Sequence, residues 1–279
     1  MFKKYWKFFV IFWSVVLVGI IGVFVFFWLI SAGKLGFMPT FEELENPNNR
    51  FASEVYFADG PIMNRYFEKE NRKYIEYREI PQSVIDALIA TEDVRFYDHS
   101  GVDVRGLFRV AKGLLTANTS AGGGSTISQQ LAKMLFPRES DLNVFELAIR
   151  KFREWVIAVR LEKSYTKEEI LTMYLNKYDF LNLAVGISSA ADIYFQVPLD
   201  SLKVEQAAML IGMAKNSSYY NPVRRPELTL NRRNVVLSQM YKYDKITREE
   251  CDSLKKLPLG LNFKRVDHKE GLATYFREY

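Results

Sequence analysis

Two glutamates on either side of a glycine-rich segment are the residues of this chain best suited to chemistry. The first, Glu92, lies four residues after Leu88 and four before Phe96, so a helix would place it on the face that its apolar neighbours bury. A buried carboxylate without a partner is costly to keep charged, so Glu92 would be poised to accept a proton as a general base. The alternative is that the helix ends there and Glu92 turns back to solvent.

Between the glutamates, three consecutive glycines lead into a predicted helix that carries Lys133. Thr126 followed by Gln129 fits a capping box, which places the helix start near the threonine. The free N–H groups and the dipole of a helix N-terminus attract anions, and Lys133 would add a positive charge on the second turn. The segment is not a Walker loop, because Gly124 is followed by Ser125 and the lysine lies inside the helix. A glycine hinge that binds no ligand is the alternative.

The second glutamate, Glu154, belongs to a cluster of charges on another predicted helix. Arg150 and Lys151 precede it by four and three residues, so the three side chains share one helical face. Such a face is usually a set of exposed ion pairs, each worth about 0.2–0.5 kcal/mol.

The composition suits a folded protein with an anionic partner. The 279 residues are 48% hydrophobic and 25% charged, which is enough to bury one large core or two small ones. The formal net charge of +5 and the pI near 9.0 favour phosphate, nucleic acid or an anionic membrane surface, without choosing among them. Cys251 is the single cysteine, which excludes a disulfide within the chain, and His99 and His268 lack metal-ligand spacing.

An apolar segment near the N-terminus predicts a membrane anchor. Residues 8–30 carry no charge and are long enough to span a bilayer as a helix. Lysines precede this segment and acidic residues follow it, so residues 1–33 are interpreted as a cytoplasmic tail and transmembrane anchor, with the remaining chain on the periplasmic or extracellular side. A cleaved signal peptide is the alternative, but its apolar region is only about 7–15 residues long.

Changes in composition divide the remaining chain into four parts. Residues 34–50 are predicted to be a linker, and residues 51–80 a small β element with a hairpin turn at residues 59–61 and a third strand at residues 74–77. From Pro81 the periodicity becomes helical, and residues 81–245 form the predicted main domain, followed by a C-terminal connection at residues 246–279. Helices are predicted to begin near Thr126, Thr166 and Thr247, from their capping boxes, and to cover residues 144–162, 187–195, 204–213 and 230–241.

Four motifs that occur in order carry a resemblance to a known family. They are EDVRFYDHSG at residues 92–101, GGSTISQQLAK at residues 123–133, RKFRE at residues 150–154 and YLN at residues 174–176. Over residues 81–241 the chain resembles the peptidoglycan glycosyltransferase (transglycosylase) domain of class A penicillin-binding proteins and of monofunctional peptidoglycan glycosyltransferases. The resemblance implies a mainly α, lysozyme-like glycosyltransferase domain, here with an N-terminal transmembrane helix and a small β element before the domain.

The resemblance also implies an activity, the polymerisation of lipid II into β-1,4-linked glycan strands with release of undecaprenyl pyrophosphate. By resemblance, Glu92 is the general base that deprotonates the 4-hydroxyl of the acceptor sugar, and Glu154 is the second catalytic residue, which supports the leaving group. The residues that the resemblance assigns to substrate binding are Lys133, Arg150, Lys151, Gln129, Gln130, Ser125, Thr126, Gly124 and Asn176. Asp93, Phe96, His99 and Gly101 are expected to shape the motif around Glu92.

The resemblance sets expectations for cofactors and partners as well. No cofactor and no dedicated metal site are expected, although a divalent cation such as Mg²⁺ or Mn²⁺ could bridge pyrophosphate and protein. The expected partners are lipid II, the growing glycan strand and the cytoplasmic (inner) membrane, with cell-wall synthesis or division proteins as further candidates and no nucleic acid. An apolar surface beside the membrane is expected at residues 107–108, 114–115 and 134–136, for which ordinary core is the alternative.

Three features of the sequence bear on how far the resemblance extends. Many relatives have a glycine where this chain has Leu181 and an aromatic residue where it has Val185. Bifunctional relatives continue into a penicillin-binding transpeptidase, and residues 267–279 look like the connection leading there, so the chain is interpreted as part of a longer class A protein.

Two other functions compete with glycosyl transfer. A lysozyme-like muramidase would also use two carboxylates, but a neutral sugar leaving group needs no cations beside them. A noncatalytic membrane scaffold that binds lipid II is the second alternative. Release of undecaprenyl pyrophosphate from lipid II, as opposed to cleavage of finished glycan, would distinguish the transferase from the muramidase, and turnover of labelled lipid II would distinguish it from the scaffold.

Overall fold

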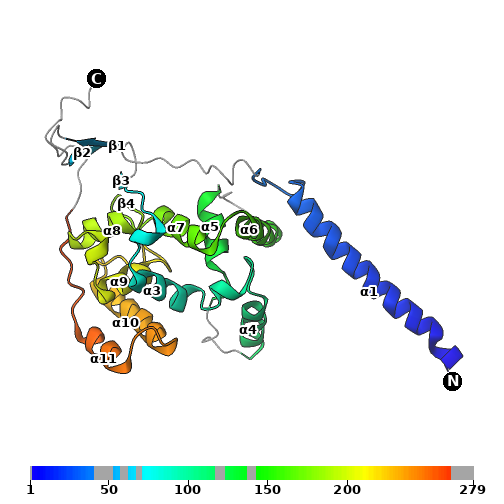
Figure 1. The fold of residues 1–279 in the computed structure, drawn as a ribbon. Coiled ribbons are helices and arrows are strands. Elements are labelled where there is room, and N and C mark those ends of the chain that lie inside the picture. The colour runs from blue at the N-terminus through cyan, green and yellow to red at the C-terminus, as the bar shows by residue number, and fades with distance from the viewer. Residues whose placement is uncertain are drawn as a thin grey trace.

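The computed structural model describes residues 2–40, 53–56, 62–66, 71–116, 123–136 and 143–264, and its fold is mainly helical. Figure 1 shows a group of packed helices from which α1 (Phe2–Ser31) extends as one long rod. The predicted mainly α fold with an apolar N-terminal helix is thereby confirmed. The expected turn at residues 59–61 and the expected connection at residues 267–279 lie outside the described residues.

The other described α-helices follow one another along the chain. They are α3 (Gln82–Glu92), α4 (Val104–Leu115), α5 (Ile127–Leu135), α6 (Val144–Ser164), α7 (Lys167–Lys177), α8 (Ile187–Phe195), α9 (Val204–Met213), α10 (Pro226–Lys242) and α11 (Arg248–Lys256). Short 3-10 turns lie at Tyr77–Glu79, Phe96–Asp98 and Leu199–Ser201.

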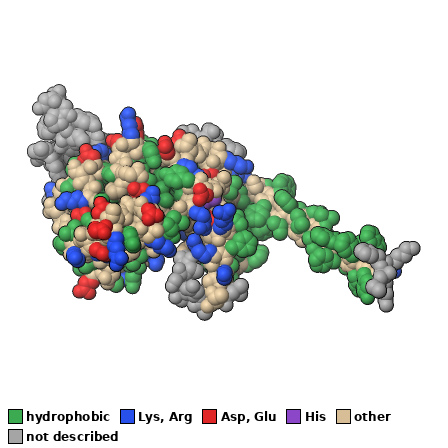
Figure 2. All heavy atoms as spheres, turned by 60° about the horizontal axis from the view of Figure 1, so that its bottom comes forward, with side chains coloured by type: hydrophobic (Ala, Val, Ile, Leu, Met, Phe, Trp, Pro, Cys, Tyr) green, Lys and Arg blue, Asp and Glu red, His purple; other side chains and the backbone are tan. Residues whose placement is uncertain are grey.

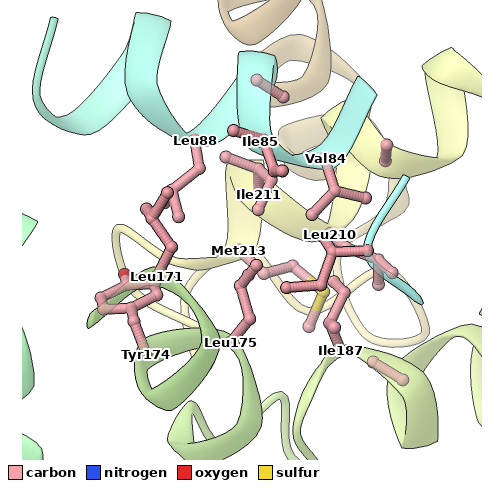
Figure 3. Packing of buried hydrophobic residues seen from close by; sticks show 14 of the residues in the cluster. Val84, Ile85, Leu88, Leu171, Tyr174, Leu175, Ile187, Leu210, Ile211 and Met213 are labelled. Carbon is pink, nitrogen blue, oxygen red and sulfur yellow. The ribbon is translucent and has the colours of Figure 1, made fainter. Parts of the chain in front are cut away.

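Helix α9 lies at the centre of the core, because residues 207–213 are all buried. Figure 3 shows how side chains of α3, α7 and α9, such as Leu88, Leu171 and Ile211, meet in one apolar cluster. Burying a side chain of this size contributes about 1.5–3 kcal/mol. The packing therefore fixes α3 along its length and, with it, the position of Glu92 at its last residue.

The small β structures differ in part from the prediction. Strands β1 (Ser53–Tyr56) and β2 (Ile62–Tyr66) form the expected antiparallel pair. The predicted third strand at residues 74–77 is wrong. A strand forms instead at β3 (Asn71–Arg72), which pairs in parallel with β4 (Ala184–Val185). The partner strand lies more than 100 residues further along the chain, so local alternation could not reveal this pairing.

Most of the predicted helix starts are confirmed by their caps. Thr166 and Thr247 form full capping boxes with Glu169 and Glu250. At Thr126 the hydroxyl accepts from the N–H of Gln129, but the Gln129 amide bonds elsewhere, so only half of that box forms. Helix α4 was not predicted, because its apolar residues are scattered between arginines and a lysine.

Helix α1 has an almost continuous apolar surface and touches the helical body only near its end. Within the described residues it is the helix long and apolar enough to cross a membrane. Its last turns pack on α6, where the rings of Phe26 and Phe27 lie 5.3 and 5.7 Å from that of Phe152. Ile30 is fully buried at this junction.

Candidate active site

Glu92 ends α3 at the wall of a pocket, and two other helices hold its carboxylate. Its Oε2 accepts a hydrogen bond from Gln130 Nε2 on α5 at 3.0 Å, and its Oε1 lies 3.4 Å from Arg232 Nη2 on α10. The side chains of Glu92 and Arg232 are 14% and 11% exposed. The expected carboxylate without a partner is therefore wrong, because α10 supplies a cation that the helical stripe of α3 could not reveal. Glu92 lines the pocket with Arg232 beside it.

A tyrosine fixes the amide that holds Glu92. Tyr174, on α7, donates its hydroxyl proton to Gln130 Oε1 at 3.0 Å. Burial, together with the nearby charge of Glu92, raises the pKa of Tyr174 well above its usual value, so the hydroxyl stays protonated and remains a donor. This bond turns the Gln130 NH₂ group toward Glu92 and fixes which side of the amide the carboxylate meets.

The motif residues after Glu92 form a buried support that joins three segments. Asp93 is 6% exposed, and its Oδ2 accepts from the N–H of Ile127 at the start of α5. The N–H of Gly101 donates to His99 Nδ1, which requires the proton to be on His99 Nε2, and that nitrogen lies 3.0 Å from Asp93 Oδ2. His99 is thus bonded into the fold between Asp93 and Gly101.

The carbonyl of Gly101 anchors the start of α5. It accepts from Thr126 Oγ1 at 2.7 Å and from Gln129 Nε2 at 3.2 Å. Gly101 has φ +94°, and a Cβ there would lie 2.8 Å from the Ala158 carbonyl carbon, so a larger residue would collide with α6. Gln129 is 1% exposed. Phe96, in the 3-10 turn Phe96–Asp98 of the same motif, is fully buried. Gln129 therefore holds the motif in place from inside the core.

The second glutamate sits on α6 and is paired within that helix. Glu154 is 7% exposed, and its Oε2 accepts from Lys151 Nζ at 2.9 Å. The same ammonium donates to Ser125 Oγ at 3.0 Å, so Lys151 links α6 to the glycine-rich segment before α5. Lys133, on α5, and Arg150, on α6, are both half-buried.

A pocket of about 410 Å³ opens between α10, the end of α3 and the glycine-rich segment. One stripe of α10 forms its long wall through Arg232, Val235, Gln239 and Lys242, which are spaced three, four and three residues apart. Glu92, Gln130, Gly124, Ser125 and Thr126 are the predicted site residues that line it, together with Asp93. On the face in Figure 2, lysine and arginine side chains gather where the helical body meets the apolar surface that leads to α1.

Four cations of the pocket were not predicted as site residues. They are Arg109, Lys215, Arg232 and Lys242. The stripe on α10 could have been found from its helical spacing, but which face of α10 meets Glu92 depends on packing against α3 and α9. Lys151 and Glu154 adjoin the pocket through Ser125, whereas they are not among the residues that line it.

Asn176 lies apart from the pocket. It is 6% exposed, its Oδ1 accepts from the N–H of Ile75, and its Nδ2 donates to the carbonyl of the same residue. Both ends of the amide are thus used to tie α7 to the segment after β3. Its expected contact with substrate has no support in this geometry, because the main chain of Ile75 occupies the amide.

No metal-binding cluster of three or more His, Cys, Asp or Glu side chains occurs in the part of the chain that the structure describes. Glu154 already has Lys151 as its charge partner, and Asp93 is bonded to His99 and to the backbone of α5.

Comparisons with known proteins show which family the chain resembles. The family model described as Transglycosylase matches residues 59–241, more than half of the chain. Penicillin-binding protein 1A of Escherichia coli (strain K12) is 36% identical over 226 residues, which are 81% of this chain and 26% of that protein. Penicillin-binding protein 1A of Aquifex aeolicus (strain VF5) is 34% identical over 267 residues, 93% of this chain and 35% of that protein.

A solved structure is similar as well. The crystal structure of Penicillin-Binding Protein 1A from Haemophilus influenzae has a TM-score of 0.46 and 21% identity, over 83% of this chain and 24% of that one. The chain spans about a quarter to a third of the length of these relatives.

Proposed function

The chain belongs to the transglycosylase family, and we propose that it is a membrane-anchored peptidoglycan glycosyltransferase that polymerises lipid II. The observation that carries the proposal is the carboxylate of Glu92, oriented by Gln130 and Arg232 at the wall of a pocket rich in cations. The product would be a β-1,4-linked glycan strand, and the leaving group would be undecaprenyl pyrophosphate.

In the proposed reaction, Glu92 takes the proton of the acceptor's 4-hydroxyl. The oxygen of that hydroxyl forms a bond to the anomeric carbon of the donor, while the bond from this carbon to the pyrophosphate oxygen breaks and its electron pair leaves with the pyrophosphate. Attack from the face opposite the leaving group inverts the anomeric carbon. The bond from Gln130 and the charge of Arg232 fix the direction of the Glu92 carboxylate, which proton transfer requires.

The leaving group gains negative charge as the bond breaks, and the cations beside the glycine-rich segment can offset it. Lys151 already lies between Ser125 and Glu154. Arg150 precedes it on α6, and Lys133 is on α5. Fixed charges aimed at developing charge are usually the largest single contribution to catalysis. Glu154 would hold Lys151 in this position, so its role would be support of the leaving-group site rather than proton transfer.

The cations argue against a muramidase. Glycoside hydrolysis expels a neutral sugar after protonation by a carboxylic acid, and that step gains nothing from several arginines and lysines. Arg109, Lys215, Arg232 and Lys242 line the pocket of Glu92, as an anionic substrate would require. Transfer from a pyrophosphate-linked donor fits this charge better.

We further propose that α1 anchors the protein in the cytoplasmic (inner) membrane, with the helical body on the outer side. The support is its length, its apolar surface and the lysines that precede it. Part of the expected apolar surface lies on α4, where Phe108 is 73% exposed, and the N-terminus of α6 adds Phe145 at 71%. Phe136 is half-buried against Phe37, and the side chains of residues 114–115 lie outside the described part of the structure.

The experiment is incubation of the purified full chain with labelled lipid II in detergent or liposomes. The proposal expects glycan polymer and free undecaprenyl pyrophosphate, whereas a muramidase would cleave finished glycan without releasing the carrier. Binding of lipid II without either product would favour the scaffold alternative.

A further inference from the structure

The segment after α1 returns across α6, and one arginine holds both of its ends. Arg160 Nη2 donates to the carbonyl and to the hydroxyl of Ser31, both at 2.8 Å, and its Nη1 donates to the carbonyl of Pro39 at 3.0 Å. Residues 31–40, called the strap below, are therefore closed into a loop by a guanidinium on α6. Hydrogen bonds from a charged donor are among the stronger ones in proteins.

The middle of the strap lies against the residue next to Glu154. Gly36 has φ +115°, and a Cβ there would lie 2.7 Å from Arg153 Cζ, so the strap backbone packs directly on the Arg153 guanidinium. Arg153 is 9% exposed and immediately precedes Glu154 on α6. A side chain at position 36 would push against α6 beside the second glutamate.

Aromatic contacts join the strap and the end of α1 to both helices that carry the leaving-group cations. Phe152 on α6 meets the rings of Phe26 and Phe27 edge-on, at 5.3 and 5.7 Å between centroids. Phe37, in the strap, lies 6.2 Å from Phe136, the C-cap residue that follows α5 and comes three positions after Lys133. The strap therefore contacts α6 and the residue after α5. The bond from Lys151 to Ser125 also joins α6 to the segment before α5.

We propose that the strap is a positioning device for the leaving-group site. Together with the end of α1, it holds α6 at positions 152, 153 and 160. On the same helix, Lys151 bonds to Ser125 in the glycine-rich segment and to Glu154. A rotation or shift of α6 that broke the contacts of positions 152, 153 and 160 would also move Lys151 and Glu154. The inference rests on the proposed function, since it takes α1 as the membrane anchor and the Lys151 cluster as the place of the pyrophosphate.

The consequence is that the anchor does more than keep the enzyme near its lipid substrate. A tilt of α1 is passed through Phe152 and Arg160 to α6, so the geometry around Lys151 depends on how the end of α1 is seated. Arg160 and the strap residues act through α6 and touch no substrate, so they are positioning residues.

The first test compares Arg160→Met with Lys163→Met in the full-length protein. Both changes remove a cation from α6, but Lys163 is exposed and lies outside the strap contacts. For Arg160→Met, kcat/KM on lipid II should fall about tenfold to a hundredfold, as expected for a small displacement of a catalytic group. The pH dependence of kcat/KM should keep its shape, because the surroundings of Glu92 are untouched. Lys163→Met should match the wild type, and equal behaviour of the two variants would overturn the proposal.

The second test asks whether the strap and Lys151 act through the same structure. If they do, Arg160→Met should cost much less activity in a Lys151→Met background than in the wild type, because the group that it positions is already gone. Full additivity of the two losses would overturn the proposal. Phe37→Leu, which weakens the contact with Phe136 and keeps the bonds of Arg160, supplies a milder strap variant and should show the same non-additivity with a smaller loss.

A third measurement does not depend on activity. Amide hydrogen exchange should become faster in α6 for Arg160→Met, remain unchanged in α10, and remain unchanged throughout for Lys163→Met. If the wild type were inactive on lipid II, the proposed function would fail while this exchange pattern would still support the strap. Unchanged exchange in α6 of an active enzyme would overturn the strap and leave the proposed function standing.

Discussion

Glu92 and Glu154 differ in what holds them. Glu92 is held by residues from α5 and α10, one through an amide hydrogen bond and the other through a guanidinium at 3.4 Å. Glu154 is held by Lys151, three residues earlier on its own helix, and by the link from Lys151 to Ser125. The first carboxylate faces the pocket with its direction fixed by distant parts of the chain, whereas the second is neutralised locally behind the pocket wall.

In the proposed reaction, this difference suits the two carboxylates to different roles. A general base must be free to take a proton and must be correctly oriented, which suits Glu92. Glu154 does not line the pocket and is bonded to Lys151, so it is placed to hold that cation and not to meet an acceptor. The two regions therefore divide the proposed reaction, with proton removal on the α3 side and charge neutralisation on the α6 side.

The largest expected effect separates the two glutamates. Glu92→Gln keeps the shape of the side chain but cannot accept a proton, so the rate of polymerisation should fall by about 10²–10⁴-fold. Glu154→Gln weakens a charge-assisted hydrogen bond and should cost about tenfold. Initial rates with labelled lipid II provide the comparison. Equal losses in the two variants would remove the division of work.

Lys133, on α5, tests the proposed cation site around Lys151 and Glu154. Lys133→Ala should lower turnover by about 100-fold, since it removes one fixed charge from the leaving-group site. Binding of phosphoglycolipid inhibitors that imitate the donor should weaken in parallel. Lys163→Ala, on the exposed face of α6, is the matched control. If Lys133→Ala changed thermal stability alone, the anion site at the start of α5 would be refuted.

Arg232 tests the α3 side with a smaller change. Arg232→Met removes the cation beside Glu92 but leaves the bond from Gln130, so the carboxylate is less well oriented and kcat should fall by about tenfold. Arg224→Met removes an exposed cation from the turn before α10 and should leave kcat unchanged. A full rate for Arg232→Met would mean that Gln130 alone orients Glu92.

The smallest expected effect lies outside both regions. Leu181, Asn182 and Leu183 have φ values of 65°, 52° and 67°, a left-handed run that costs about 1–2 kcal/mol per residue for L-amino acids. Leu181→Gly should therefore raise the unfolding free energy by about 0.5–1 kcal/mol, while Leu181→Ala keeps the strain and should not. Denaturant unfolding compares the two. Unchanged rates on lipid II would show that this loop is independent of both glutamates.

Local sequence patterns predicted those parts of the fold and of the site in which the interacting residues are close in sequence. Capping boxes located the starts of α7 and α11, and the spacing of Lys151 and Glu154 predicted a pair that the structure contains. The motif around Glu92 was found because its residues lie within ten positions of one another. In each case the interacting groups lie within one helix or one turn.

The remaining features depend on segments that only tertiary packing brings together. Arg232 comes 140 positions after Glu92, and nothing in the sequence of α10 indicates which of its faces meets α3. Gln129 looked like a substrate contact because it stands in the motif, but burial against the carbonyl of Gly101 gives it a structural role. The strap was equally hidden, since its bonds join residues near the N-terminus to Arg160 on α6.

The central claim is that Glu92 removes the acceptor's proton and is not needed to hold the substrate. The most direct test measures lipid II binding and undecaprenyl pyrophosphate release in the same sample of Glu92→Gln. Binding is expected within about a factor of two of the wild type, together with no release above background. Near-normal release by this variant, or loss of binding that accounts for the loss of turnover, would contradict it.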